Sequence, residues 1–157
     1  MPEESMTDAE NHGLERLSRD HREMAEVYQR YLLLVADRQI GEADRLLDEF
    51  ADRMMRHLQE EERFWVPLFE HHYGESKGFG AKLILEEHKV LERLLGALRF
   101  LVNTIAQRKR PLEAQQVLTV LEESFRFRGV MSHHHSREDN VMIPALAALP
   151  GEALQED

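Results

Sequence analysis

The sequence contains no cysteine, and this absence excludes several classes of site. Its 157 residues can form no disulfide bond, no cysteine-bound zinc site, no iron–sulfur cluster and no thiol nucleophile. Glycine and proline are scarce, with eight and five residues, and they gather at a few breaks in the chain. The longest apolar run covers only residues 32–36, which is too short for a membrane-spanning helix.

Basic residues are outnumbered by acidic ones, 20 to 30, so the formal net charge is −10. Nucleic-acid-binding surfaces are basic and anionic membranes repel an acidic surface, so we expect neither partner. The first eleven residues are acidic and polar, so we expect no signal peptide and a cytoplasmic location. The length predicts one domain over residues 1–157, with a core at about 8–148 and tails at 1–7 and 149–157.

Four segments between the glycine and proline breaks repeat apolar residues at intervals of three and four, as one face of a helix does. They cover roughly residues 8–38, 42–72, 79–108 and 112–148. A segment of about 30 residues makes a helix of about 45 Å. Four such helices with short connections predict an all-α protein, an antiparallel up-down-up-down four-helix bundle.

Histidine and glutamate interrupt the apolar stripes of these segments. The first and third segments carry one lone histidine each, and the other two carry a histidine four residues before a glutamate: His21, His57, Glu61, His88, His134 and Glu138. Residues four apart share a helix face, so all six can converge in the bundle core. Six such groups are too many for one tetrahedral zinc ion. They suit two ions of iron, manganese or zinc, each with two histidines, bridged by the carboxylates.

An internal repeat supports this grouping. Residues 50–69 align with residues 127–146 at an offset of 77, with five identities that include the histidine and the glutamate of each motif. The first and third segments align at an offset of 67, which pairs His21 with His88. The chain therefore consists of two similar helical hairpins, each with one lone histidine and one His-x-x-x-Glu motif.

The order His, His-x-x-x-Glu, His, His-x-x-x-Glu, with each motif helix continuing to a proline at Pro67 or Pro144, resembles the hemerythrin-like family, also called the HHE cation-binding domain. The resemblance covers about residues 10–148. It implies a four-helix bundle around a non-haem di-iron centre, in which the six residues above would hold two oxo- or hydroxo-bridged iron ions. The four-His, two-Glu branch is implied, because Glu92 stands where oxygen-carrying hemerythrins have a fifth histidine. Glu92 is either an additional ligand or a solvent-facing side chain.

The resemblance predicts a function in oxygen, nitric oxide or peroxide sensing, or in iron handling, with a small diatomic molecule or peroxide as the partner of the centre. Zinc or manganese are the alternative metals, since imidazole and carboxylate ligands suit them as well. The alternative function, from another class, is a zinc-stabilised or metal-free helical interaction module that binds a protein partner.

The other histidines are expected outside the centre. Within the run 133–135, the repeat selects His134, so His133 and His135 are expected beside the site or at the surface. The remaining histidines lie near the start of the chain or at a helix end and are expected at the surface: His12, His71 and His72.

Overall fold

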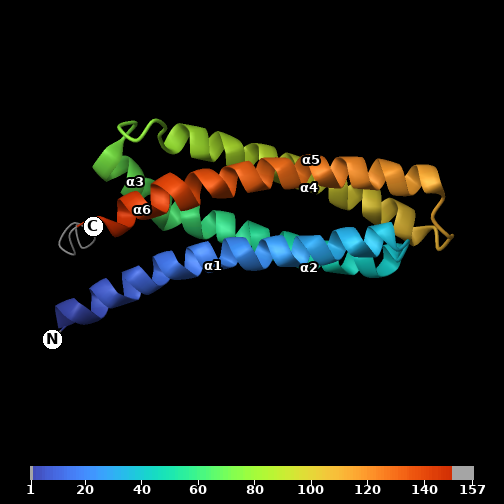
Figure 1. Cartoon of the computed structure of the whole chain (residues 1–157), viewed down its shortest axis with the longest axis horizontal. Helices are drawn as coiled ribbons and strands as arrows, with labels where there is room; N and C mark the ends of the chain where they lie inside the picture. Colours follow the sequence, from blue (N-terminus) through green and yellow to red (C-terminus); the bar gives the residue numbers. More distant parts are fainter. Residues whose placement is uncertain (1, 150–157) are drawn as a thin grey trace.

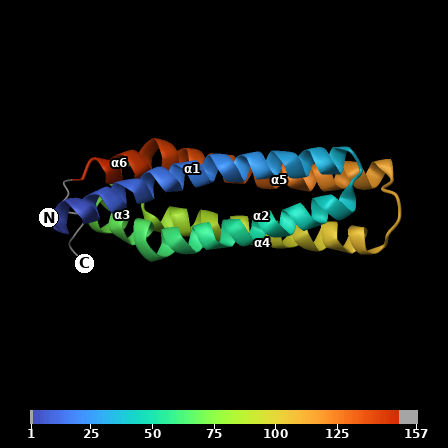
Figure 2. The ribbon, with the colours of Figure 1, turned by 90° about the horizontal axis from the view of Figure 1, so that it is seen from below.

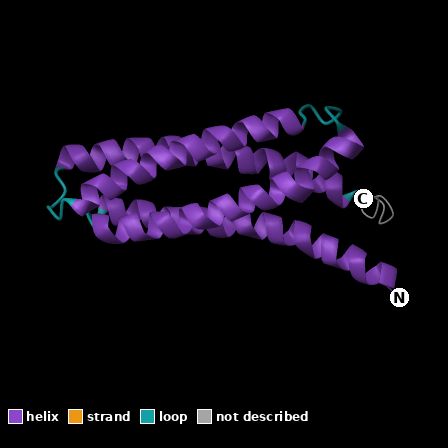
Figure 3. Ribbon diagram, turned by 180° about the vertical axis from the view of Figure 1, so that it is seen from behind, coloured by secondary structure: helices purple, strands orange, loops and turns teal. Residues whose placement is uncertain are grey.

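The computed structural model describes the backbone of residues 2–149 and the side chains of residues 13–149. Four long helices make up most of it (Figure 1): α1 (Pro2–Ala36), α2 (Ile40–Glu60), α4 (Ala81–Gln107) and α5 (Ala114–Arg137). The described residues contain no strand (Figure 3). No helix among them is long and apolar enough to cross a membrane.

Two of the helical segments continue beyond their long helix through a short π-helical turn. After α2 come η1 (Glu61–Trp65) and α3 (Val66–Tyr73), and after α5 come η2 (Glu138–Met142) and α6 (Ile143–Ala147). The repeat seen in the sequence is therefore also a repeat of this interrupted helix.

The helices are arranged as an antiparallel four-helix bundle, which confirms the predicted fold class. α1 packs against α2 and α5, and α4 packs against the same two helices on the opposite side (Figure 2). The connections between the four helical segments, at residues 37–39, 74–80 and 108–113, are too short for anything but antiparallel neighbours. Gly74 and Gly78 adopt positive φ angles of 54° and 96° in the second connection, which a side chain would disfavour.

The apolar core is divided into two clusters with a polar layer between them. One cluster fills the end of the bundle where the 37–39 and 108–113 connections lie. It includes Met24, Met54, Leu91 and Met131, with Tyr28 and Phe127 in ring contact. The other fills the end formed by α3 and α6, and its members next to the polar layer come from all four helical segments: Leu17, Trp65, Ile84 and Met142. The polar layer is thus enclosed by apolar side chains on two sides.

A proline explains each π-helical turn. Pro67 and Pro144 have no N–H group to donate to the carbonyl four residues earlier, and their rings crowd that carbonyl. The N–H of the preceding residue reaches back five residues instead, from Val66 to the carbonyl of Glu61 and from Ile143 to the carbonyl of Glu138. Each turn therefore begins at the glutamate of a His-x-x-x-Glu motif, and π-helical turns are common at functional sites.

Candidate metal centre

The structure brings all six predicted side chains together in the polar layer. Each is at most 3% exposed: His21, His57, Glu61, His88, His134 and Glu138. α1 and α4 each supply a lone histidine, and α2 with η1 and α5 with η2 each supply a histidine and a glutamate. The i, i+4 spacing places each glutamate one turn from its histidine, as the sequence predicts.

The two glutamates lie between histidines of different hairpins. Glu61 is 2.5 Å from Nε2 of His57 through one carboxylate oxygen and 3.5 Å from Nε2 of His88 through the other. Glu138 lies 3.2 Å from Nε2 of His134 and 3.3 Å from Nε2 of His21. Both carboxylates therefore lie between a histidine of one hairpin and a histidine of the other.

The potential ligand atoms fall into two adjoining groups, within each of which they lie within 4.8 Å of one another. One group consists of His21, His57, His135 and Glu138, and the other of Glu61, His88, His134 and Glu138. Glu138 belongs to both. The Nε2 atoms of His21 and His57 are 2.9 Å apart, so both nitrogens could reach one ion at a bond length of about 2.1 Å.

The buried polar atoms of this layer fit a pair of cations. Both carboxylate oxygens of Glu61 and of Glu138 are buried without a hydrogen-bond partner, as are the Nε2 atoms of His88 and His134. Burying such groups unsatisfied is costly, whereas two cations would satisfy them together. The donor set of imidazole nitrogen and carboxylate oxygen suits iron, manganese or zinc.

Each of the four predicted ligand histidines also has a carboxylate that faces its other ring nitrogen, Nδ1. We call these four side chains the outer carboxylates. The distances from Nδ1 are 2.8 Å for His21 to Asp139, 2.9 Å for His88 to Glu62, 3.4 Å for His134 to Glu87 and 3.8 Å for His57 to Asp20. An Nδ1–H group that faces a carboxylate leaves the lone pair of Nε2 directed into the core, which is the tautomer that binds a metal.

These outer carboxylates occupy equivalent positions in the two halves of the internal repeat. Asp20 and Glu87 precede the two lone histidines, and each faces the motif histidine of its own hairpin. Glu62 and Asp139 follow the two motif glutamates, and each faces the lone histidine of the other hairpin. In the sequence, these outer carboxylates are visible as acidic residues directly next to four of the six predicted ligands.

The carboxylates raise the pKa values of the buried histidines. Burial favours the neutral imidazole, but contacts with Asp139, Glu138 and Glu61 outweigh it and raise the pKa of His21 to about 11. Contacts with Glu138 and Glu87 outweigh burial in the same way and raise the pKa of His134 to about 10. The pKa of His57 and that of His88 are also raised. A metal needs neutral imidazole, so its binding releases protons from these side chains.

The two glutamates shift in opposite directions. Burial and the negative charge of Glu61 raise the pKa of Glu138. Although burial acts against it, the proximity of Glu138 and of three histidines holds the pKa of Glu61 well below its usual range. Two neighbouring buried carboxylates cannot both ionise easily without added positive charge, and a bound cation would supply that charge.

Glu92, for which the sequence left two alternatives, is exposed to solvent on α4 and lies outside both groups. His133 and His71 are exposed as expected, and His72 is half-buried at the end of α3. The side chain of His12 lies outside those that the structure describes.

The sequence left two positions open for His135, beside the site or at the surface, and the structure shows it beside the site. It is only 6% exposed and belongs to the group of His21 and His57. Its ring stacks on that of His21, with 3.9 Å between the centroids and 7° between the planes. The repeat held a signal for this burial, because the equivalent residue of the first hairpin, Leu58, is also buried.

His135 also differs from the other four histidines in its electrostatics. Burial and the positive charges of His21 and His57 hold the pKa of His135 far below its ordinary value. Its Nε2 atom is buried without a hydrogen-bond partner. His135 is therefore a neutral imidazole beside four imidazoles that are paired with carboxylates.

Comparison with known protein families agrees with this arrangement. The model of the hemerythrin HHE cation-binding domain matches the chain twice, over residues 12–83 and over residues 79–156. Each match covers one helical hairpin, so the repeat inferred from the sequence is visible in the family match as well. No curated protein and no solved structure matches the chain. With a buried histidine–glutamate cluster in a four-helix bundle and a family match over nearly its whole length, the chain belongs to the hemerythrin HHE cation-binding domain family.

Proposed function

We propose that this protein is a non-haem di-iron protein whose centre binds a small diatomic molecule or peroxide, in sensing or detoxification of that molecule or in iron handling. The observation that carries the proposal is the pair of adjoining, fully buried ligand groups that share Glu138. A cytoplasmic location and the absence of a nucleic-acid or membrane partner stay predictions from the sequence.

The proposed ligands are the six residues of the repeat. His21 and His57 would hold one ion, and His88 and His134 the other, with Glu61 and Glu138 between them. Bound iron would supply redox chemistry with a small ligand. The outer carboxylates orient the four imidazoles, and the two apolar clusters restrict the access of water.

Elemental analysis tests the proposal, on protein purified from iron-supplemented cells and combined with an absorption spectrum. We expect about two iron ions per chain, one for each ligand group, and a near-ultraviolet band from the bridged ferric pair. One zinc ion per chain, or no metal, would overturn the di-iron proposal and favour the alternative of a helical interaction module.

Two glutamate variants make the test specific to the site. Glu61→Ala removes a carboxylate that lies between the two hairpins, so we expect it to lose most of the bound iron. Glu92→Ala changes an exposed glutamate on α4 and should keep the iron content of the unaltered protein. Equal iron content in the two variants would contradict the assignment of Glu61 as a ligand.

A further inference from the structure

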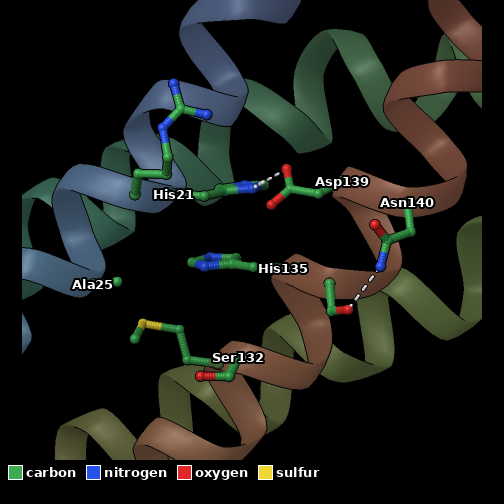
Figure 4. A pocket seen from close by; sticks show the side chains of 9 residues that line it. His21, Ala25, Ser132, His135, Asp139 and Asn140 are labelled. Carbon is green, nitrogen blue, oxygen red and sulfur yellow. Dashed lines mark hydrogen bonds and ion pairs between the residues drawn. The ribbon is translucent and has the colours of Figure 1, made fainter.

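A surface pocket of about 320 Å³ leads to one side of the centre, between α1 and α5 with the start of η2 (Figure 4). Its lining includes His21 and Arg22 from α1, Ser132 and His135 from α5, and Asp139 from η2. The pocket therefore touches a proposed ligand, His21, and that ligand's outer carboxylate, Asp139, which are joined by a hydrogen bond. It is thus a surface pocket directly beside the ion that His21 and His57 would hold.

His135 belongs both to the lining of this pocket and to the site. Its ring lines the pocket and stacks on His21 (Figure 4). Its Nε2 atom is fully buried and has no hydrogen-bond partner among the described residues, although the side chain belongs to the ligand group of His21, His57 and Glu138. Buried polar groups are almost always satisfied, so this nitrogen calls for a partner in the functional protein.

The stacking of His135 on His21 argues against His135 as a further metal ligand. An imidazole binds a metal through a lone pair in the plane of its ring, so two imidazoles on one ion direct their planes toward that ion. The rings of His21 and His135 lie nearly parallel, 7° apart, so their lone pairs point along parallel planes and do not converge. A hydrogen bond to something bound at the ion fits this geometry better.

Within the part of the chain that the structure describes, this feature is found at one of the two ligand groups. The residue equivalent to His135 in the first hairpin is Leu58, which is 1% exposed and belongs to the apolar core. The ligand group of His88 and His134 contains no additional imidazole. The two hairpins otherwise contribute equivalent ligands and equivalent outer carboxylates. The presence of His135 in place of a leucine therefore makes the two halves of the centre different.

We propose that the small ligand enters through this pocket and binds at the ion held by His21 and His57, where Nε2 of His135 forms a hydrogen bond with it. The inference rests on the proposed di-metal function and adds to it the ion, the route and the contacting residue. It fits a ligand of a few atoms that can accept a hydrogen bond.

Titration of the iron-loaded protein with sodium azide, followed by absorption, tests the proposal. His135→Leu reproduces the residue of the first hairpin and removes the hydrogen bond. We expect it to keep two irons per chain and the spectrum of the azide-free protein but to bind azide about tenfold more weakly. His135→Gln retains a side-chain N–H donor and should recover part of the affinity. His133→Leu, at an exposed neighbour on α5, is the matched control and should bind azide normally.

A second variant tests the route. Ser132 is an exposed residue of the pocket lining, so Ser132→Trp should slow azide association at least several-fold without changing the iron content. Stopped-flow mixing measures this rate, with His133→Leu as the control.

The outcomes separate this inference from the proposed function. Three results would overturn the inference: unchanged azide affinity in His135→Leu, an equal loss of affinity in His133→Leu, or an unaltered association rate in Ser132→Trp. In each case, two irons per chain would still support the proposed di-iron function. Loss of an iron or a changed azide-free spectrum in His135→Leu would overturn it in favour of His135 as a ligand. Failure of the unaltered protein to hold an iron pair would remove the proposed function and this inference together.

Discussion

At the residue scale, the site is organised as much by its outer carboxylates as by its proposed ligands. Asp139 illustrates this, because it accepts a hydrogen bond from Nδ1 of His21 at 2.8 Å and another from Ser18 at 3.0 Å. It follows Glu138 directly in the sequence, so a single helical turn supplies both a proposed ligand and the group that orients another ligand. Outer partners of this kind tune metal affinity strongly.

The pKa of Asp139 makes its contribution dependent on pH. Burial acts to raise this pKa, but His21 outweighs burial and lowers it below the ordinary value of 3.8. A carboxyl group with a lowered folded-state pKa stabilises the fold above its unfolded pKa, and this stabilisation is lost as the pH falls through the lowered value. We expect Asp139→Asn to reduce the stability of the metal-free protein at pH 7 by about 0.5–1 kcal/mol, because the pair is partly exposed.

Urea denaturation of the two metal-free proteins at pH 7 and at pH 3 measures this contribution. The difference between Asp139→Asn and the unaltered protein should shrink at pH 3, where the carboxyl group begins to protonate. Asp52→Asn, at an exposed position of α2, is the control and should show little difference at either pH. An equally large difference for Asp139→Asn at both values would mean that the charge of Asp139 is not the cause.

At the scale of the helical element, a π-helical turn begins at each of the two motif glutamates. Each turn closes with an N–H to carbonyl bond that spans five residues and ends on the glutamate itself. The helix consequently gains one residue within the turn and changes the face that its later residues present. The glutamate can then point into the polar layer while Trp65 or Met142, four residues later, packs in the apolar cluster.

Pro144→Ala tests this role of the proline. Alanine restores an N–H group, so η2 can relax toward an α-helix and displace Glu138. We expect metal to dissociate about tenfold faster into a chelator, as when an outer contact of a metal site is lost. Pro111→Ala, at an exposed proline in the 108–113 connection, is the control. Equal dissociation rates for both variants would show that the proline does not act on the centre.

At the scale of the whole molecule, the polar layer joins all four helical segments between two apolar clusters. The larger cluster holds buried residues from α1, α2, α4 and α5, and the smaller one also draws on α3 and α6. Hydrophobic burial at both ends can hold the bundle together, while close histidine–glutamate pairs in the middle, such as His57 and Glu61, offset part of the cost of burying these groups. The fold should therefore survive without metal, although with lower stability.

Metal removal measures this division of stability. We expect the metal-free protein to keep its helical circular dichroism and to melt in one transition at a lower temperature. At a free metal concentration of a thousand times Kd, the bound form should gain about 4 kcal/mol. Glu61→Ala provides the control, because added metal should raise its melting temperature far less. Loss of helix on chelation would contradict the view that the apolar clusters suffice for folding.

Much of this protein could be predicted from its sequence for a simple physical reason. Helical periodicity is a local property, so the four helical segments and their buried faces follow from the spacing of apolar residues. Two of the site histidines, His57 and His134, are tied to their glutamates by an i, i+4 spacing within one helix. The repeat then linked them to His21 and His88, and the structure places all four in one buried layer.

What the sequence did not predict depends on contacts between helices. The sequence left two positions open for Glu92 and for His135, because the rotation of α4 and α5 about their own axes decides which side chains face the core. Packing against α1 and α2 sets that rotation. The π-helical turns also escaped prediction, although Pro67 and Pro144 marked their positions. The helices, the repeat and the six converging residues follow from local spacing and can be read along one chain. The neighbours that complete the site become visible in the folded protein, because ring stacking, the outer carboxylates and the pocket arise where separate helices meet.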